Sequence, residues 1–236
     1  MNNSKTDSRD SSRSSWPEQL VEVFVFLFLI VPSMVLSFFA VKQGTLSFAL
    51  VAFATIIRDL ALVSLILFFL WRNGEHVNRI GWKLKNIWKE VALGIGLYIP
   101  LLFATGFFEN ALRVAGFSEP STPLPSFLAA KDTVQFLLAI ALVAVIALAE
   151  ETIFRGYLIL RLKAITGNTL MAALLSAALF SLGHGYEGSA GVVTVGFMGL
   201  VFAFVYMWRQ NLVAPIVMHF LQDFIGIVLL PWLGKG

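Results

Sequence analysis

Seven apolar segments of membrane-spanning length constrain this chain more than any other feature. A bilayer core about 30 Å thick needs roughly 20 helical residues at about 1.5 Å each. The segments are residues 20–41, 46–71, 87–108, 133 onward past 149, 170–184, 192–208 and 212–230, of which the fifth and sixth are short. Open sheet edges do not occur in lipid, and no pattern of ten-residue alternating strands is present. We therefore expect an all-α, polytopic transmembrane helical bundle with about seven spans.

The composition agrees with a membrane protein. Of the 236 residues, 58% are hydrophobic and 13% are charged, whereas soluble domains carry about 25% charged residues. The absence of cysteine excludes disulfides, Cys-ligated zinc, iron–sulfur clusters and thiol nucleophiles. The net charge of +3 comes with no basic patch interleaved with aromatic residues, so we expect no nucleic-acid partner.

Basic residues indicate the orientation. Residues 1–15 are polar and Ser-rich, which is typical of a disordered tail. Lys and Arg gather in this tail, in the loop after the second segment and after the fourth segment. Because basic loops stay cytoplasmic, we expect a cytoplasmic N-terminus, in a bacterial plasma membrane. Residues 16–110 then form the N-terminal transmembrane helices with their basic cytoplasmic loop.

Ionisable residues inside apolar helices are costly, so they are candidates for function. Glu150 and Glu151 interrupt the fourth segment, and Arg155 follows four residues after Glu151. This spacing predicts a pair between Glu151 and Arg155 on one helix face. Glu150 then points about 100° away towards a different neighbour, where a free carboxylate can take a proton from water. The alternative is that both acids simply lie at the wet end of the helix.

Two of the three histidines lie in the same half of the chain. His184 follows Phe180 by four residues at the end of the fifth segment, and His219 precedes Asp223 by four within the seventh. A lone helical histidine is usually structural. Scattered buried polar groups are costly, however, so we expect the acids, the arginine and the histidines to meet in one polar cluster. Straight helices would instead place Glu150 near the cytoplasmic side and His184 near the outer side.

The second segment contains the adjacent residues Arg58 and Asp59. Neighbours in a helix point about 100° apart, so we expect them to contact other helices and not each other. A structural role is the favoured interpretation.

Several protease and nucleotide-binding patterns are absent, namely H-E-x-x-H, G-x-S-G, G-x-G-D, the P-loop and the dinucleotide fingerprint. The remaining pattern resembles the CPBP family, which comprises the CAAX-prenyl endopeptidases and the bacteriocin-processing, Abi-type membrane proteases. The resemblance rests on three motifs, E-E-x-x-x-R, F-x-x-x-H and H-x-x-x-N/D, over about residues 130–230. In this chain they are formed by Glu150, Glu151, Arg155, Phe180, His184, His219 and Asp223.

The resemblance implies an intramembrane endopeptidase whose catalytic core is residues 130–232, in the C-terminal four-helix half. Its substrate would be a membrane-associated peptide, such as a prenylated protein or a leader peptide, and membrane lipids would surround it. Glu150 would be the general base that activates water, and His184 would orient that water. His219 and Asp223 would stabilise the oxyanion. Glu151, Arg155 and Phe180 would support them.

Asp223 departs from the family pattern, in which Asn is common. An ionised Asp cannot donate a hydrogen bond to an oxyanion. Asp223 is therefore protonated, orients His219, or binds a metal, and the candidate Zn²⁺ ligands are Glu150, His184, His219 and Asp223. The family has been described both as metalloproteases and as glutamate-type enzymes, and we expect no obligatory metal. Two other functions stay open, a transporter or proton relay that uses the same residues, and a non-catalytic scaffold or immunity-type protein.

Overall fold

The computed structural model describes residues 16–43, 47–118 and 130–234, and within them every regular element is helical. The predicted tail 1–15 lies outside these ranges. The predicted all-α, polytopic bundle is confirmed. In chain order the helices are α1 (Trp16–Gln43), α2 (Phe48–Arg72), η1 (Val77–Ile80), α3 (Ile87–Val114), α4 (Thr133–Glu150), η3 (Glu151–Leu158), α5 (Ile159–Thr166), α6 (Thr169–Leu182), η4 (Gly185–Glu187), α7 (Gly188–Arg209), α8 (Val213–Asp223), η5 (Phe224–Leu229) and α9 (Leu230–Leu233).

Within the described ranges, six helical segments are long and apolar enough to cross a membrane. Three of them join several elements: α4, η3 and α5 form one run of 34 residues, η4 and α7 form one of 25 residues, and α8, η5 and α9 form one of 21 residues. The fifth predicted segment corresponds to α6, which has 14 residues and is about 21 Å long. This helix is too short to span a bilayer core by itself.

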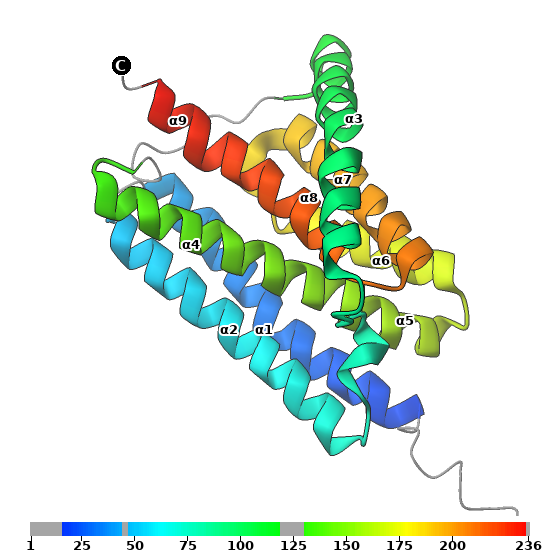
Figure 1. Ribbon diagram of the computed structural model, residues 1–236. Helices are drawn as coiled ribbons and strands as arrows, with labels where there is room; N and C mark the ends of the chain where they lie inside the picture. The colour runs from blue at the N-terminus through cyan, green and yellow to red at the C-terminus, as the bar shows by residue number, and fades with distance from the viewer. Residues whose placement is uncertain (1–15, 44–46, 119–129, 235–236) are drawn as a thin grey trace, which may run out of the picture.

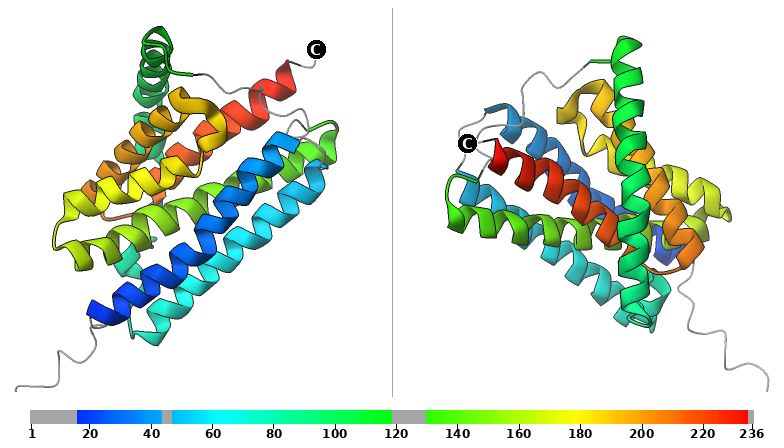
Figure 2. Two further views of the ribbon diagram at one scale, coloured as in Figure 1. Left: turned by 180° about the vertical axis from the view of Figure 1, so that it is seen from behind. Right: turned by 45° about the horizontal axis from the view of Figure 1, so that its top comes forward.

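The helices pack in two groups (Figures 1 and 2). α1 and α2 lie along the α4–α5 rod, while α6 and α7 pair with each other on the other side of that rod. α3 stands steeply across α8 and contacts α7 as well. The α8–α9 rod runs antiparallel to α4, because Trp232 at its end packs on Phe136 at the start of α4, with ring centroids 4.7 Å apart.

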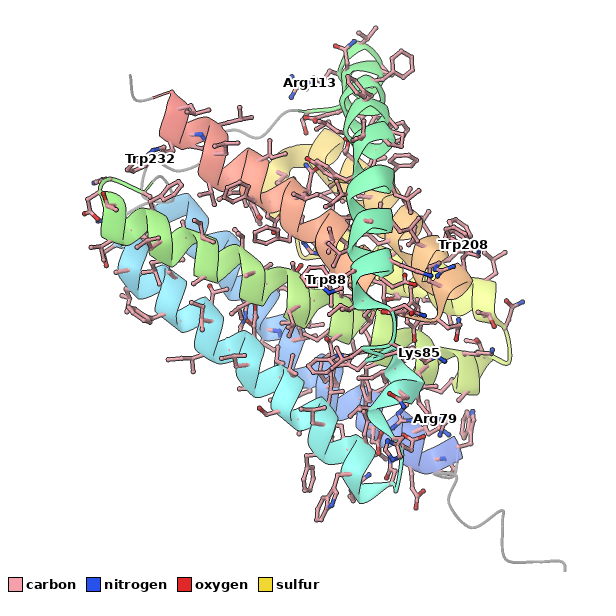
Figure 3. The ribbon with its side chains drawn as sticks, in the orientation of Figure 1. Arg79, Lys85, Trp88, Arg113, Trp208 and Trp232 are labelled. Atoms are coloured by element: carbon pink, nitrogen blue, oxygen red, sulfur yellow. The ribbon has the colours of Figure 1, made fainter. Side chains whose placement is uncertain are left out.

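Tryptophans and basic side chains mark the two ends of the bundle. Figure 3 shows Arg79, Lys85 and Trp208 towards one end and Arg113 and Trp232 towards the other. Between these ends, large apolar side chains such as Phe24 and Phe107 face outward, 74% and 77% exposed. Such a surface is stable against lipid, with aromatic and basic residues at the membrane interfaces.

A buried ion network joins α1 to α2 and α5 at the end of the bundle that carries Arg79. Glu22 is 1% exposed. Its carboxylate accepts hydrogen bonds of 2.6–3.0 Å from four side chains, those of Arg72, Asn73, Tyr157 and Arg161. Arg161 also donates to Glu75 at 2.6 Å. Because each charge has a partner, this network fixes the three helices to one another. Glu22 was not predicted to have a role, although an acid inside an apolar segment is a signal that the sequence contains.

Candidate active site

A π-helical stretch lies at the centre of the longest rod. All eight residues of η3 are buried, and a π turn holds more residues than an α turn and is frequent at functional sites. Ser176 of α6 donates to the Phe154 carbonyl oxygen at 2.5 Å, and Trp82 of the loop before α3 donates to Thr152 at 3.0 Å. Neighbouring elements therefore hold η3 from two sides.

The Glu151 carboxylate connects η3 to α8. Its Oε1 lies 2.8 Å from Arg155 Nη1 and 2.8 Å from His219 Nδ1. The predicted pair between Glu151 and Arg155 is confirmed. Both side chains are fully buried, so the arginine supplies the positive charge that an ionised buried carboxylate needs. Because a carboxylate only accepts, Nδ1 of His219 carries a hydrogen in this contact.

The other ring nitrogen of His219 faces two further acids. Nε2 lies 3.7 Å from Glu150 Oε2 and 3.5 Å from Asp223 Oδ2. His219 and Asp223 share a helix face, as their spacing predicted. Glu150 and Glu151 were expected to have different neighbours, but both reach the same imidazole, because the ring presents one nitrogen to each. The structure thus brings Glu150, Glu151, Asp223 and His219 into one cluster.

Phe180 and Phe202 form the apolar frame of this cluster. The Arg155 guanidinium lies over both rings, 4.2 Å from the Phe180 centroid and 5.2 Å from that of Phe202. His219 stacks on Phe202 at 5.6 Å and meets the edge of Phe180 at 5.9 Å. These contacts fix the rotamers of Arg155 and His219 and exclude water from one side of them. Phe202 was not predicted, because one phenylalanine among many in an apolar helix carries no signal.

His184 joins the edge of the cluster. Its ring lies 4.9 Å from the Phe180 centroid. Since His219 packs on the same ring at 5.9 Å, the two imidazole centroids are at most about 11 Å apart, the sum of the two separations. Nδ1 of His184 donates to the Phe180 carbonyl oxygen at 3.0 Å. In the neutral ring, Nε2 then has a free lone pair that can accept a hydrogen bond.

The expectation that His184 and Glu150 lie at different depths is wrong, and the long rod explains why. The rod continues from Glu151 to Thr166, about 20 Å further, and α6 returns over about 21 Å. The C-terminal end of α6 therefore comes back to the level of Glu151. The fourth segment was predicted only as far as just past residue 149, whereas the helix continues to Thr166 before it turns.

Three polar residues that were not predicted as part of the site act electrostatically on it. Asp59 of α2 interacts with Glu150, and Tyr98 of α3 interacts with Asp223. Tyr186 of η4 interacts with both of these acids. Asp59 was expected not to pair with Arg58, and this was wrong: Arg58 Nε donates to Asp59 Oδ1 at 2.8 Å. The arginine side chain is long enough to fold back to its neighbour.

Four buried polar atoms in or beside the cluster have no hydrogen-bond partner in the described part of the chain. They are Asp59 Oδ2, Tyr98 Oη, Glu150 Oε2 and Glu151 Oε2. Buried polar groups in proteins nearly always have a partner, from the protein, from water or from a ligand. Two of these atoms belong to Glu150 and Glu151, whose carboxylates contact His219, so acceptors for water or a polar substrate group lie beside this ring.

The arrangement of the candidate ligands bears on whether a metal ion fits here. In the described ranges, no group of three or more His, Asp or Glu side chains is arranged to hold a metal ion. Nδ1 of His219 already contacts Glu151, and Nδ1 of His184 contacts a backbone carbonyl. The four candidate ligands, Glu150, His184, His219 and Asp223, do not form a preorganised zinc site in this arrangement.

Comparisons with known proteins point to the same half of the chain. Residues 132–225 match the family model of the Rce1-like type II CAAX prenyl endopeptidases. The chain is also similar to the membrane-embedded CAAX protease MroQ of Staphylococcus aureus (strain USA300), with 34% identity over 82 residues, which is 32% of this chain and 32% of that relative. The alignment thus spans about a third of the relative's length. No solved structure matches the chain.

Proposed function

We propose, from the premise that residues 132–225 belong to the Rce1-like type II CAAX prenyl endopeptidase family, that this chain is an intramembrane endopeptidase. The observation that carries the proposal is the placement of Glu150 Oε2 3.7 Å from Nε2 of His219, with Asp223 beside the same nitrogen. An oxygen atom beside this pair can lie within hydrogen-bond distance, about 2.8 Å, of both the carboxylate oxygen and the imidazole nitrogen. Peptide hydrolysis needs this combination of a base and an oxyanion donor.

Glu150 acts as the general base. It accepts a proton from water while the water oxygen bonds to the carbonyl carbon of the scissile peptide. The carbonyl oxygen gains a negative charge and is stabilised by nearby donors, including Nε2–H of His219 when both ring nitrogens are protonated. The carbon–nitrogen bond then breaks, and the proton held on Glu150 passes to the leaving amine. Water supplies every atom that the products gain.

The remaining residues position these groups. Glu151 holds His219 through Nδ1, and Arg155 holds Glu151. The free Nε2 lone pair of His184 accepts a hydrogen bond from the attacking water and so orients it. The proposed steps use these side chains and water alone.

The substrate class follows from the surroundings. The cluster lies within helices that present large apolar side chains to lipid, so a substrate reaches it from the membrane. We propose a membrane-associated peptide, either the C-terminal segment of a prenylated CAAX protein or a leader peptide. Residues 130–232 then form the catalytic core, supported by the helices within 16–110, and the N-terminus is cytoplasmic in a bacterial plasma membrane.

The test uses the full chain, purified and reconstituted in liposomes. Two internally quenched probes are offered, a farnesylated peptide that ends in a CAAX box and an unprenylated leader-type peptide. We expect cleavage of at least one probe by the wild-type protein and a loss of roughly 10²–10⁴-fold in Glu150→Gln. Glu109→Gln, a change of the exposed acid that pairs with Arg113 on α3, serves as the matched control and keeps wild-type activity.

Two results would redirect the interpretation. Ion-dependent flux across the liposome membrane without cleavage of either probe would favour a transporter or proton relay. Full biological activity of Glu150→Gln would favour a non-catalytic scaffold. Either result contradicts the proposed hydrolysis.

A further inference from the structure

Tyr98 is a buried tyrosine whose hydroxyl has no hydrogen-bond partner in the described part of the chain. It lies in the middle of α3, outside the segment that matches the family model, and is 4% exposed. It belongs to the apolar cluster that also contains Phe202 and Met218, and its Oη has no hydrogen-bond partner among the described residues. A buried hydroxyl without a partner is energetically unfavourable. A phenylalanine would fill the same apolar space without this cost, so packing does not account for the hydroxyl.

The hydroxyl belongs to the cluster around His219. The charged group that acts on it electrostatically is the Asp223 carboxylate, and Asp223 lies 3.5 Å from Nε2 of His219. Phe202, a member of the same apolar cluster, stacks on the His219 ring. Helix α3 packs along α8, which carries both His219 and Asp223. Tyr98 therefore reaches the surroundings of the cluster from α3, on the side of Asp223.

The cluster has many acceptors and few donors. Glu150, Glu151 and Asp223 only accept when they are ionised. The oxyanion of peptide hydrolysis needs donors that are in place before the charge develops. A tyrosine hydroxyl donates one hydrogen bond and keeps its proton, and this one has no competing acceptor among its apolar neighbours.

We infer that Tyr98 donates a hydrogen bond to the oxyanion that develops on the scissile carbonyl, an inference that rests on the proposed function. No covalent bond changes at Tyr98. The hydroxyl acts together with His219 and supplies the donor that an ionised Asp223 cannot. α3 is thereby part of the active site, although its sequence carries none of the three motifs.

The inference is tested by a double-mutant cycle with the reconstituted full chain and the farnesylated and unprenylated probes. We expect Tyr98→Phe to lower kcat roughly 100-fold with KM little changed. In the Asp223→Asn background, where the amide supplies a donor, the same change lowers kcat by about three-fold or less. Thermal stability of Tyr98→Phe stays equal to that of wild type or rises, because the hydroxyl has no hydrogen-bond partner within the described ranges.

The matched control is Tyr206→Phe, a change of another buried tyrosine, which lies on α7 near Gly81 and Leu212. It keeps the wild-type kcat. A kcat of Tyr98→Phe within about two-fold of wild type, or equal losses in the two backgrounds, overturns the inference while the proposed function stands. A lower melting temperature with an unchanged kcat also overturns it. A wild-type protein that cleaves neither probe overturns the proposed function and the inference together.

Discussion

Glu151 holds His219 from a neighbouring helix, with Oε1 2.8 Å from Nδ1 of the imidazole. Replacing Glu151 by Gln removes the charge that fixes the hydrogen on Nδ1. We expect kcat for probe cleavage to fall roughly 10²–10⁴-fold, as when the carboxylate partner of a catalytic histidine is made neutral. KM changes little, because Glu151 does not touch the substrate. Steady-state kinetics in liposomes measures both parameters.

The matched control for this prediction is Glu90→Gln. Glu90 is also buried and paired with an arginine, with 2.6 Å between its Oε1 and Arg209 Nη2, but it lies outside the cluster. Its replacement leaves kcat unchanged. Equal losses of activity in the two variants would show a general effect of removing a buried acid and contradict a positioning role for Glu151.

Arg155 and Arg113 form ion pairs with the same spacing and very different burial. Arg155→Ala leaves the fully buried Glu151 carboxylate without its cation, so we expect a loss of about 3–5 kcal/mol in the free energy of unfolding. Arg113→Ala breaks an exposed pair with Glu109 and costs about 0–1 kcal/mol. Denaturant unfolding in detergent compares them, and similar losses in both would contradict the importance of burial.

Gly199 leaves space for Phe180, which belongs to the apolar frame of the cluster. A Cβ at this position would lie 3.1 Å from Phe180 Cδ1 and 3.3 Å from Arg155 Nη2. We expect Gly199→Ala to cost about 1–3 kcal/mol of stability and to lower kcat, because Arg155 and Phe180 must shift. Gly106→Ala on α3, where a Cβ meets nothing within 4 Å, is neutral or stabilises by up to about 1 kcal/mol. Thermal melting and probe cleavage are measured for both.

The orientation is testable because the chain contains no cysteine. Lys85 lies just before α3 and Lys131 just before α4, and both side chains are exposed. In intact cells, a membrane-impermeant maleimide should label Lys131→Cys and leave Lys85→Cys unlabelled until the membrane is opened. The reverse pattern would place the N-terminus outside, contrary to the distribution of basic residues.

Removal of metal should leave the reaction intact. Nδ1 of His219 contacts Glu151, and no set of three ligands is arranged for a metal in the described residues. After dialysis against EDTA, we expect the rate of probe cleavage to stay within about two-fold of the untreated rate. A loss that added Zn²⁺ restores would instead assign Glu150, His184, His219 and Asp223 as ligands.

The membrane-spanning pattern and the local pairs were predictable from sequence because both follow from helix periodicity. Apolar runs of about 20 residues define spans, and a spacing of four residues places Glu151 beside Arg155 and His219 beside Asp223. These relationships need no knowledge of how the helices pack.

The three-dimensional assembly of the site was not predictable in the same way. The depth of His184 in the bundle depends on where the α4–α5 rod ends and the chain turns into α6. An apolar sequence does not determine the position of that turn. Asp59, Tyr98 and Phe202 approach from three other helices, and only the packing of those helices reveals them. The fold-back of Arg58 onto Asp59 depends on a side-chain rotamer, which the angular rule for helix neighbours ignores.

The pairing of Glu151 with Arg155 inside one continuous helix has a consequence for biogenesis. During cotranslational insertion, this helix leaves the ribosome well before α8 delivers His219. A lone charge in the lipid costs about 2.5–3.5 kcal/mol on insertion scales. Since the two opposite charges are neighbours along the same helix, they neutralise each other as soon as that helix forms. The nascent chain can thus enter the translocon without waiting for the rest of the site.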